Sequence, residues 1–133
     1  EILDAMQRDF MRDERVQPVT RTVSRIHVVE ESRHIRYARE EIVRRTRHLS
    51  RTERVRVRLQ LGISAYFVVT SLVHDDVYAA AGLDVAEATA AVRANTHYHD
   101  RLREGARRTI EFLDGVGQIG RASTLLLRRA HVL

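Results

Sequence analysis

The stretch that decides the fold is IHVVEESRHIRYAREE, residues 26–41. Within it, His27, Glu31 and His34 follow one another at intervals of four and three residues. On a helix of about 3.6 residues per turn, side chains at these intervals lie on one face and within about two turns. Imidazole and carboxylate groups are the ligands that iron, manganese and zinc accept in proteins. The stretch therefore predicts a helix with a metal-binding face.

The helical wheel places this face in an apolar stripe. At about 100° per residue, Val23 and Ile35 flank the arc that holds the two histidines and Glu31. We therefore expect the three polar side chains to be buried. An ionised carboxylate in an apolar interior is unfavourable unless it is compensated, and a metal ion is one way to compensate it. An ion pair with Arg45, which lies on the same arc, is another way to compensate it. A buried polar cluster that holds no metal is the alternative interpretation of the three residues.

Glu30 is a further candidate for a metal ligand. It stands three residues after His27 and close to the same arc, so periodicity alone does not exclude it as a ligand. It is equally suited to accept a hydrogen bond from the N–H group of a ligating histidine without binding the metal itself. Spacing also does not separate iron from manganese.

The whole chain is predicted to be all-α. Its apolar residues recur with a period near 3.6, glycine is sparse, and Pro18 is the single proline, suited to the first turn of a helix. The first helix is expected to bury Ile2, Leu3, Met6 and Phe10. Helix-start and helix-stop signals divide the sequence into segments at 1–12, 19–49, 50 to about 72, 77–81, 84–93, 95–115 and 119–133.

Composition narrows the classes of function. The 133 residues suit one domain spanning 1–133; they include no cysteine, and the net charge of +5 comes from arginine alone. We find no apolar run of membrane-spanning length and no signal peptide, so we expect a cytoplasmic protein without membrane contact. The ten arginines of residues 33–58 suggest a nucleic-acid binder, but acids are interleaved with them and few aromatics accompany them. A solvated surface with salt bridges is the preferred interpretation.

Residues 18–39, PVTRTVSRIHVVEESRHIRYAR, resemble the carboxy-terminal ligand helix of the p-aminobenzoate N-oxygenase family. The histidine one turn before Glu-x-x-His is the specific feature, and the resemblance covers about residues 1 to 50. It implies a ferritin-like helical bundle with two iron ions, manganese being possible, that uses dioxygen to oxidise a small aromatic amine. By position it implies that His27, Glu31 and His34 are iron ligands. It also implies a carboxylate ligand on the preceding helix, for which Glu1 is the nearest candidate.

The predicted site is half complete. Ferritin-like di-iron centres take Glu-x-x-His from each of two helices and a further Glu from each of two others. Only one Glu-x-x-His occurs in this sequence. We therefore expect the chain to be the carboxy-terminal portion of a larger helical domain, with the amino-terminal half of the same protein and a homodimeric copy as partners. A non-catalytic ferritin-like metal-binding or structural protein and an arginine-rich helical nucleic-acid binder remain alternative functions.

The other histidines are interpreted as surface residues. His97 and His99 are two apart and would face opposite sides of a helix. His74 precedes two aspartates that suit a helix start. His48 and His131 have no partner that the sequence identifies.

Overall fold

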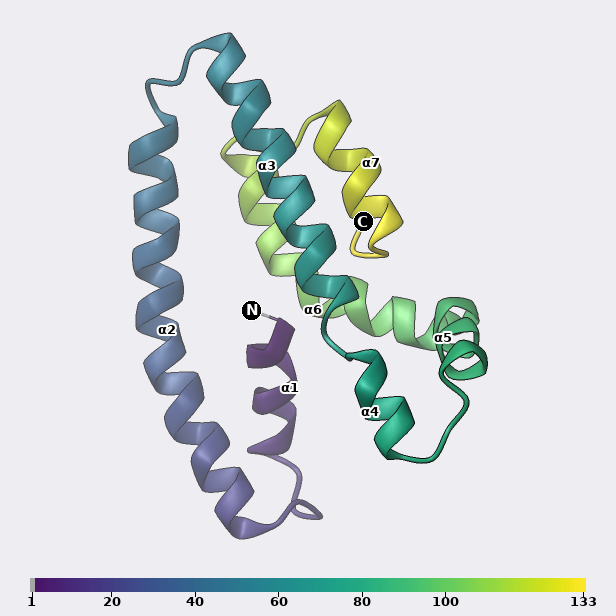
Figure 1. Ribbon diagram of the computed structural model, residues 1–133. Helices are drawn as coiled ribbons and strands as arrows, with labels where there is room; N and C mark the ends of the chain where they lie inside the picture. Colours follow the sequence, from purple (N-terminus) through teal and green to yellow (C-terminus); the bar gives the residue numbers. More distant parts are fainter. Residues whose placement is uncertain (1) are drawn as a thin grey trace.

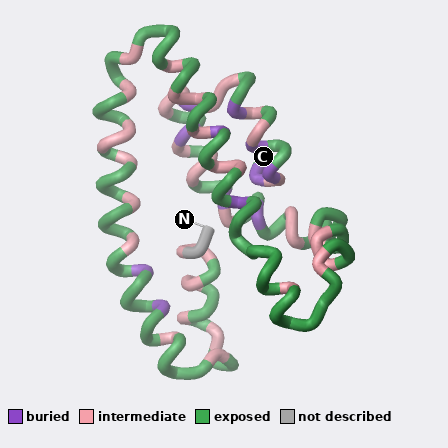
Figure 2. The backbone as a smooth tube through the Cα atoms, viewed as in Figure 1, coloured by how far each residue is buried: buried purple, intermediate pink, exposed green. Residues whose placement is uncertain are grey.

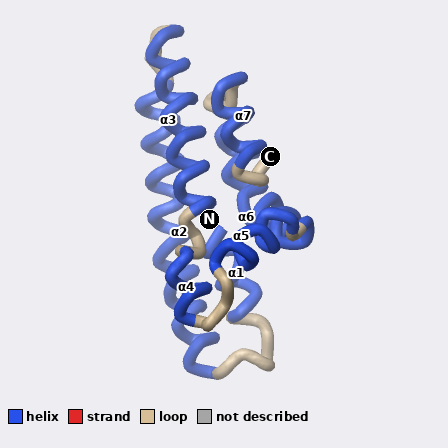
Figure 3. The backbone as a smooth tube through the Cα atoms, turned by 45° about the vertical axis from the view of Figure 1, so that its right-hand side comes forward, coloured by secondary structure: helices blue, strands red, loops and turns tan. Residues whose placement is uncertain are grey.

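The computed structural model describes residues 2–133, with side chains from Asp4 onward, and its described residues form helices, turns and loops without strands (Figure 3). The all-α prediction is confirmed. Helix bounds are α1 Ile2–Phe10, α2 Pro18–Thr46, α3 Arg51–Thr70, α4 Asp75–Ala80, α5 Val85–Ala94, α6 Thr96–Gly115 and α7 Arg121–Arg129. The predicted candidate ligand Glu1 lies outside the described residues.

Local sequence sets the helix starts. Pro18 occupies the first turn of α2. At α3 the hydroxyl of Ser50 accepts a hydrogen bond from the Glu53 N–H, and the Glu53 carboxylate accepts one from the Ser50 N–H at 2.9 Å. This capping box begins the helix that the sequence predicts from residue 50. Asp84 caps α5 by accepting the Glu87 N–H at 2.8 Å. At α4 the cap is His74 itself, not the aspartates that follow it.

The long helices α2 and α3 form an open hairpin, and the shorter helices fill only part of it (Figure 1). Helix α1 packs on α2 and also touches α6, α7 packs along α3, and α4 contacts α5. The core joins α3, α6, α7 and the chain after α7. Its buried residues are Val69, Leu102, Ala106, Leu127, Ala130 and Val132.

Helices α3 and α7 approach each other closely at two glycines. A Cβ built on Gly62 would lie 2.9 Å from the Cα of Ser123, and one on Gly120 would lie 2.8 Å from the Cδ of Arg58. The Arg58 guanidinium donates two hydrogen bonds to the Gly117 carbonyl, from Nε at 3.1 Å and Nη2 at 2.6 Å. These contacts fix α7 against α3.

Many large apolar residues are exposed, most of them on α2 and α3. Figure 2 shows both helices mainly in the colours of exposed and intermediate residues. Met6 and Phe10 are 45% and 41% exposed, so the prediction that they lie on the buried face of the first helix is wrong. The segment Arg51–Ala80 is long and apolar enough to cross a membrane by length and composition alone, a weak signal that core helices of soluble proteins share. In this structure part of it is the α3 wall of the core.

Candidate metal-binding face of helix α2

The packed face of α2 differs from the predicted one. Ser24 and Val28 are 4% and 6% exposed and point to where α1 packs, and Ile35 and Ile42 continue this line at intermediate exposure. At about 100° per residue the middle of this face lies about 80° from His27. The expectation that the histidines lie in the middle of the buried stripe is therefore wrong.

The three predicted ligands lie along one edge of that packed face. Their side chains are 48% exposed at His27, 36% at Glu31 and 71% at His34. Glu31 is nearest to the packed side, and the histidines turn toward solvent. Beyond them lies a second apolar face that no described helix covers. It consists of Val19, Val23, Ile26 and Tyr37, each more than half exposed.

One carboxylate oxygen of Glu31 lies close to both histidines. Oε1 of Glu31 lies 3.1 Å from Nδ1 of His34 and 4.0 Å from Nε2 of His27. In the tautomer of His34 that has its proton on Nδ1, this N–H group donates a hydrogen bond to Glu31. Nε2 of His34 then keeps a free lone pair. The donor set is thus two imidazoles and one carboxylate on consecutive turns, which fits the ligand preferences of iron and manganese.

The described residues do not complete a metal site. No group of three or more His, Cys, Asp or Glu side chains in residues 4–133 is arranged to hold an ion. A centre at this face needs donors from outside these residues, which agrees with the single Glu-x-x-His of the sequence.

Neighbouring charges take other partners. Glu30 is 3.4 Å from Arg33, so here its contact is with a guanidinium and not with an imidazole. Arg45, the predicted compensating cation, pairs with Glu41, as does Arg44. Both arginines lower the pKa of Glu41 by hydrogen bonding. This pairing within α2 matches the predicted salt-bridged surface. Arg45 therefore does not compensate Glu31, which contacts the histidines instead.

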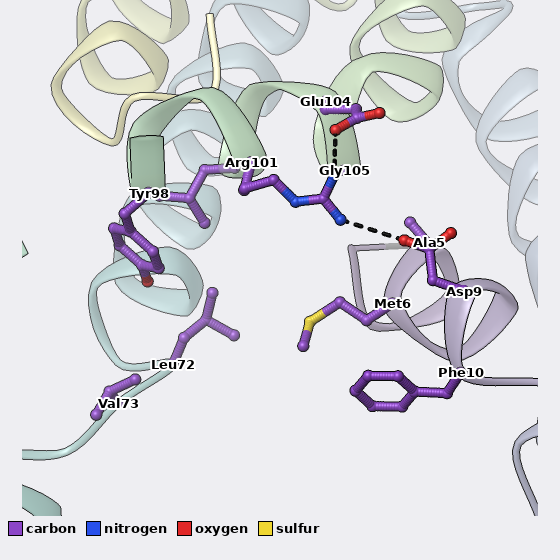
Figure 4. Close-up of a pocket in the computed structure, with 11 residues that line it drawn as sticks. Ala5, Met6, Asp9, Phe10, Leu72, Val73, Tyr98, Arg101, Glu104 and Gly105 are labelled. Carbon is purple, nitrogen blue, oxygen red and sulfur yellow. Dashed lines mark hydrogen bonds and ion pairs between the residues drawn. The ribbon is translucent and has the colours of Figure 1, made fainter. Parts of the chain in front are cut away.

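A separate apolar cleft of about 470 Å³ lies between α1, α6 and the end of α3 (Figure 4). Apart from the ion pairs at its rim, its walls are mainly Ala5, Met6, Phe10, Leu72, Val73, Tyr98, Leu102 and Gly105. At the rim, Arg101 binds Asp9 at 3.2 Å and Glu104 at 2.6 Å. Sequence reasoning did not find this cleft because its walls come from three separate segments. The exposed α3 residues Ile63, Phe67 and Val68 do not line it.

Comparison with known protein families gives a match over most of the chain. The family model of the p-aminobenzoate N-oxygenase AurF matches residues 1–117, which include α1 to α6 and the whole of the His27–His34 unit. No curated protein and no solved structure matches. The matched region covers most of the 133 residues and extends well beyond the ligand helix that first suggested the resemblance. The chain therefore belongs to the p-aminobenzoate N-oxygenase AurF family.

Proposed function

We propose that this chain supplies His27, Glu31 and His34 to a non-haem di-iron centre that uses dioxygen to oxygenate the nitrogen of an aryl amine. One observation carries the proposal. In a chain of this oxygenase family, the His-x-x-x-Glu-x-x-His unit borders an apolar helix face that no described helix covers. Family membership supports oxygenase chemistry in general, and the ligand set is our inference from the α2 geometry.

The chain's own residues have distinct roles in this proposal. Glu31 orients His34 through Nδ1, so that Nε2 is presented to the metal in a fixed tautomer. The Glu31 carboxylate provides negative charge, which compensates a divalent ion. The two irons, when bound, supply the electrons that dioxygen activation needs.

The uncovered face also has a role. Val23, Ile26 and Tyr37 would exclude water once a partner helix covers them, and a dry site strengthens the electrostatic interactions inside it. The partner must bring carboxylates and a second Glu-x-x-His to complete two metal positions. We propose that these helices belong to the amino-terminal half of the same protein. The homodimer and the cytoplasmic location remain predictions.

The experiment compares iron content and product formation in the full-length protein. Wild type, Glu31→Ala and Glu40→Ala are loaded anaerobically with Fe(II), and bound iron is quantified. They are then exposed to dioxygen with p-aminobenzoate, the compound in the family's name, and N-oxygenated products are measured. Glu40 is the matched control because it lies on the same helix, exposed and paired with Arg36.

Glu31→Ala should lose iron and product together, and Glu40→Ala should retain both. Full iron content in Glu31→Ala would refute the ligand assignment. Iron bound by wild type without oxygenation of any amine tested would instead favour a non-catalytic metal-binding protein. Repeating the loading with Mn(II) separates the two metals.

A further inference from the structure

A second cavity has a volume of about 690 Å³. Its lining residues come from the ends of α3 and α7, the short helices α4 and α5, the start of α6 and the chain after α7. No described residue of α1 or α2 lines it, so it is separate from the proposed metal face. Its polar lining residues are Tyr66, Thr70, Asp75, Tyr78, Thr89, Arg93, Tyr98, His99, Arg129 and His131.

The permanent charges of this lining are mostly positive. Arg93 comes from α5 and Arg129 from the last turn of α7, whereas Asp75 is the one carboxylate in the lining. Neither arginine forms an ion pair or hydrogen bond with another described residue. Two guanidinium groups without a protein partner are a typical means of recognising an anion.

A stacked pair of histidines also lines the cavity. The rings of His99 and His131 are 3.6 Å apart and parallel within 1°. Burial, His99 and Arg103 lower the pKa of His131. Part of this effect is electrostatic, because the nearby Arg103 cation opposes a positive charge on His131. Arg103 is itself paired with Asp100. An anion in the cavity would relieve this repulsion.

The remaining lining supplies donors and apolar walls. The Oγ1 atom of Thr89 is shielded from solvent and has no hydrogen-bond partner among the described residues. The three tyrosines offer hydroxyl groups and ring faces, and Val69, Val92 and Leu102 complete the apolar part. Apolar walls with a few placed polar groups are typical of small-molecule sites.

We propose that this cavity binds a small organic anion, with its carboxylate or phosphate group against Arg93 and Arg129 and its apolar body against the tyrosines. The bound anion would favour protonation of His131, whose ring stacks on His99 in the lining. Affinity should therefore increase as the pH falls below the ordinary histidine pKa of about 6.5 and through the lowered pKa of His131. The ionisable groups around the pair are Tyr66 on α3, Asp75 and Tyr78 on α4, Arg93 on α5, Tyr98 and Arg103 on α6, and Arg129 on α7.

The test is calorimetric titration with phenylacetate and phenyl phosphate, and with benzylamine as the cationic counterpart. Both anions share the apolar body, so the tighter one identifies the preferred headgroup. Arg93→Gln and Arg129→Gln should each weaken anion binding by about tenfold, typical of a lost charge-assisted hydrogen bond. Arg128→Gln is the matched control, because this neighbour on α7 is exposed and does not line the cavity.

Proton uptake provides a second measurement. Titration in two buffers of different ionisation enthalpy should show protons taken up by wild type and none by His131→Asn. Asparagine tolerates the positive φ of 57° that His131 adopts, so the variant keeps the backbone. The proposal is overturned if neither anion binds, if benzylamine binds as tightly, or if Arg128→Gln has the same effect. Glu31→Ala should bind the anions normally, so failure of the metal proposal would be seen separately.

Discussion

Oε1 of Glu31 lies 3.1 Å from Nδ1 of His34, one turn further along α2. This contact joins two predicted ligands, and it leaves Nε2 of His34 as the nitrogen that faces outward. His27, on the other side of Glu31, lies at 4.0 Å and is less constrained. The carboxylate is thus the centre of the unit, and the histidines flank it.

Replacing His34 should weaken metal binding. We expect His34→Ala to reduce the affinity of the full-length protein for Fe(II) by more than about tenfold, because even outer partners of ligands are worth about 10–100-fold. Equilibrium dialysis against Fe(II) measures this. His48→Ala is the control, since His48 follows the end of the same helix and is exposed. Equal affinities in the two variants would remove His34 from the ligand set.

The sequence predicted the helices well because their signals are local. The Ser50–Glu53 capping box, Pro18 and the Asp84 cap depend on neighbours within a few residues, and the structure has helix starts at each. The His27–His34 unit was found for the same reason, since a fixed spacing on one helix requires no knowledge of the fold.

The orientation of α2 could not be predicted in the same way. This helix carries apolar residues on two sides, one through Val28 and Ile35, the other through Val23 and Ile26. Periodicity merges the two into one stripe with the histidines at its middle. Only packing partners decide which side is covered, and α1 covers the first.

The contact between His99 and His131 was also beyond sequence reasoning. The sequence identifies no partner for His131, whereas in the structure the chain after α7 folds back and brings the two rings to 3.6 Å. His131 itself adopts a positive φ just after the end of α7, a position that glycine usually occupies. Because no glycine stands there, no local signal in the sequence marks the turn.

Packing of α7 on α3 should be sensitive at Gly62. Gly62→Ala places a Cβ 2.9 Å from the Ser123 backbone, which neither helix can relieve by rotating a side chain. We expect a loss of about 1–3 kcal/mol in the free energy of unfolding, the usual cost of overpacking. Urea unfolding followed by circular dichroism measures it. Gly115→Ala, at a helical site with open space around it, should be neutral or slightly stabilising. A stable Gly62→Ala would show that the helices can move apart freely.

Arg58 should stabilise the fold more than other arginines of α3. Its two hydrogen bonds to the Gly117 carbonyl are partly buried and hold the turn between α6 and α7. Arg58→Ala is expected to lower the free energy of unfolding by about 1.5–3 kcal/mol, the range for hydrogen bonds to charged groups. Arg56→Ala, at an exposed position on the same helix, should change it by less than about 0.5 kcal/mol. Comparable losses in both variants would mean that general charge, and not this contact, is responsible.

Stability should fall in mildly acidic solution because of His131. Burial, His99 and Arg103 lower its pKa in the folded chain below the usual 6.5. Below pH 6.5 the unfolded chain therefore binds the proton more readily than the folded chain, and protonation favours unfolding. The free energy of unfolding should be constant above about pH 7.5, decrease as the pH falls through 6.5, and level off below the folded-state pKa.

Urea titrations between about pH 5 and 8, in a buffer whose ions do not fill the cavity, measure this dependence. His131→Asn should flatten the curve while it keeps the backbone at positive φ. His97→Asn is the matched control, since His97 is exposed on the same helix as His99, and it should leave the slope unchanged. A slope that persists in His131→Asn would assign the acid sensitivity to another group. If the free energy of unfolding of wild type does not change with pH over this range, the folded chain does not lower the pKa of His131.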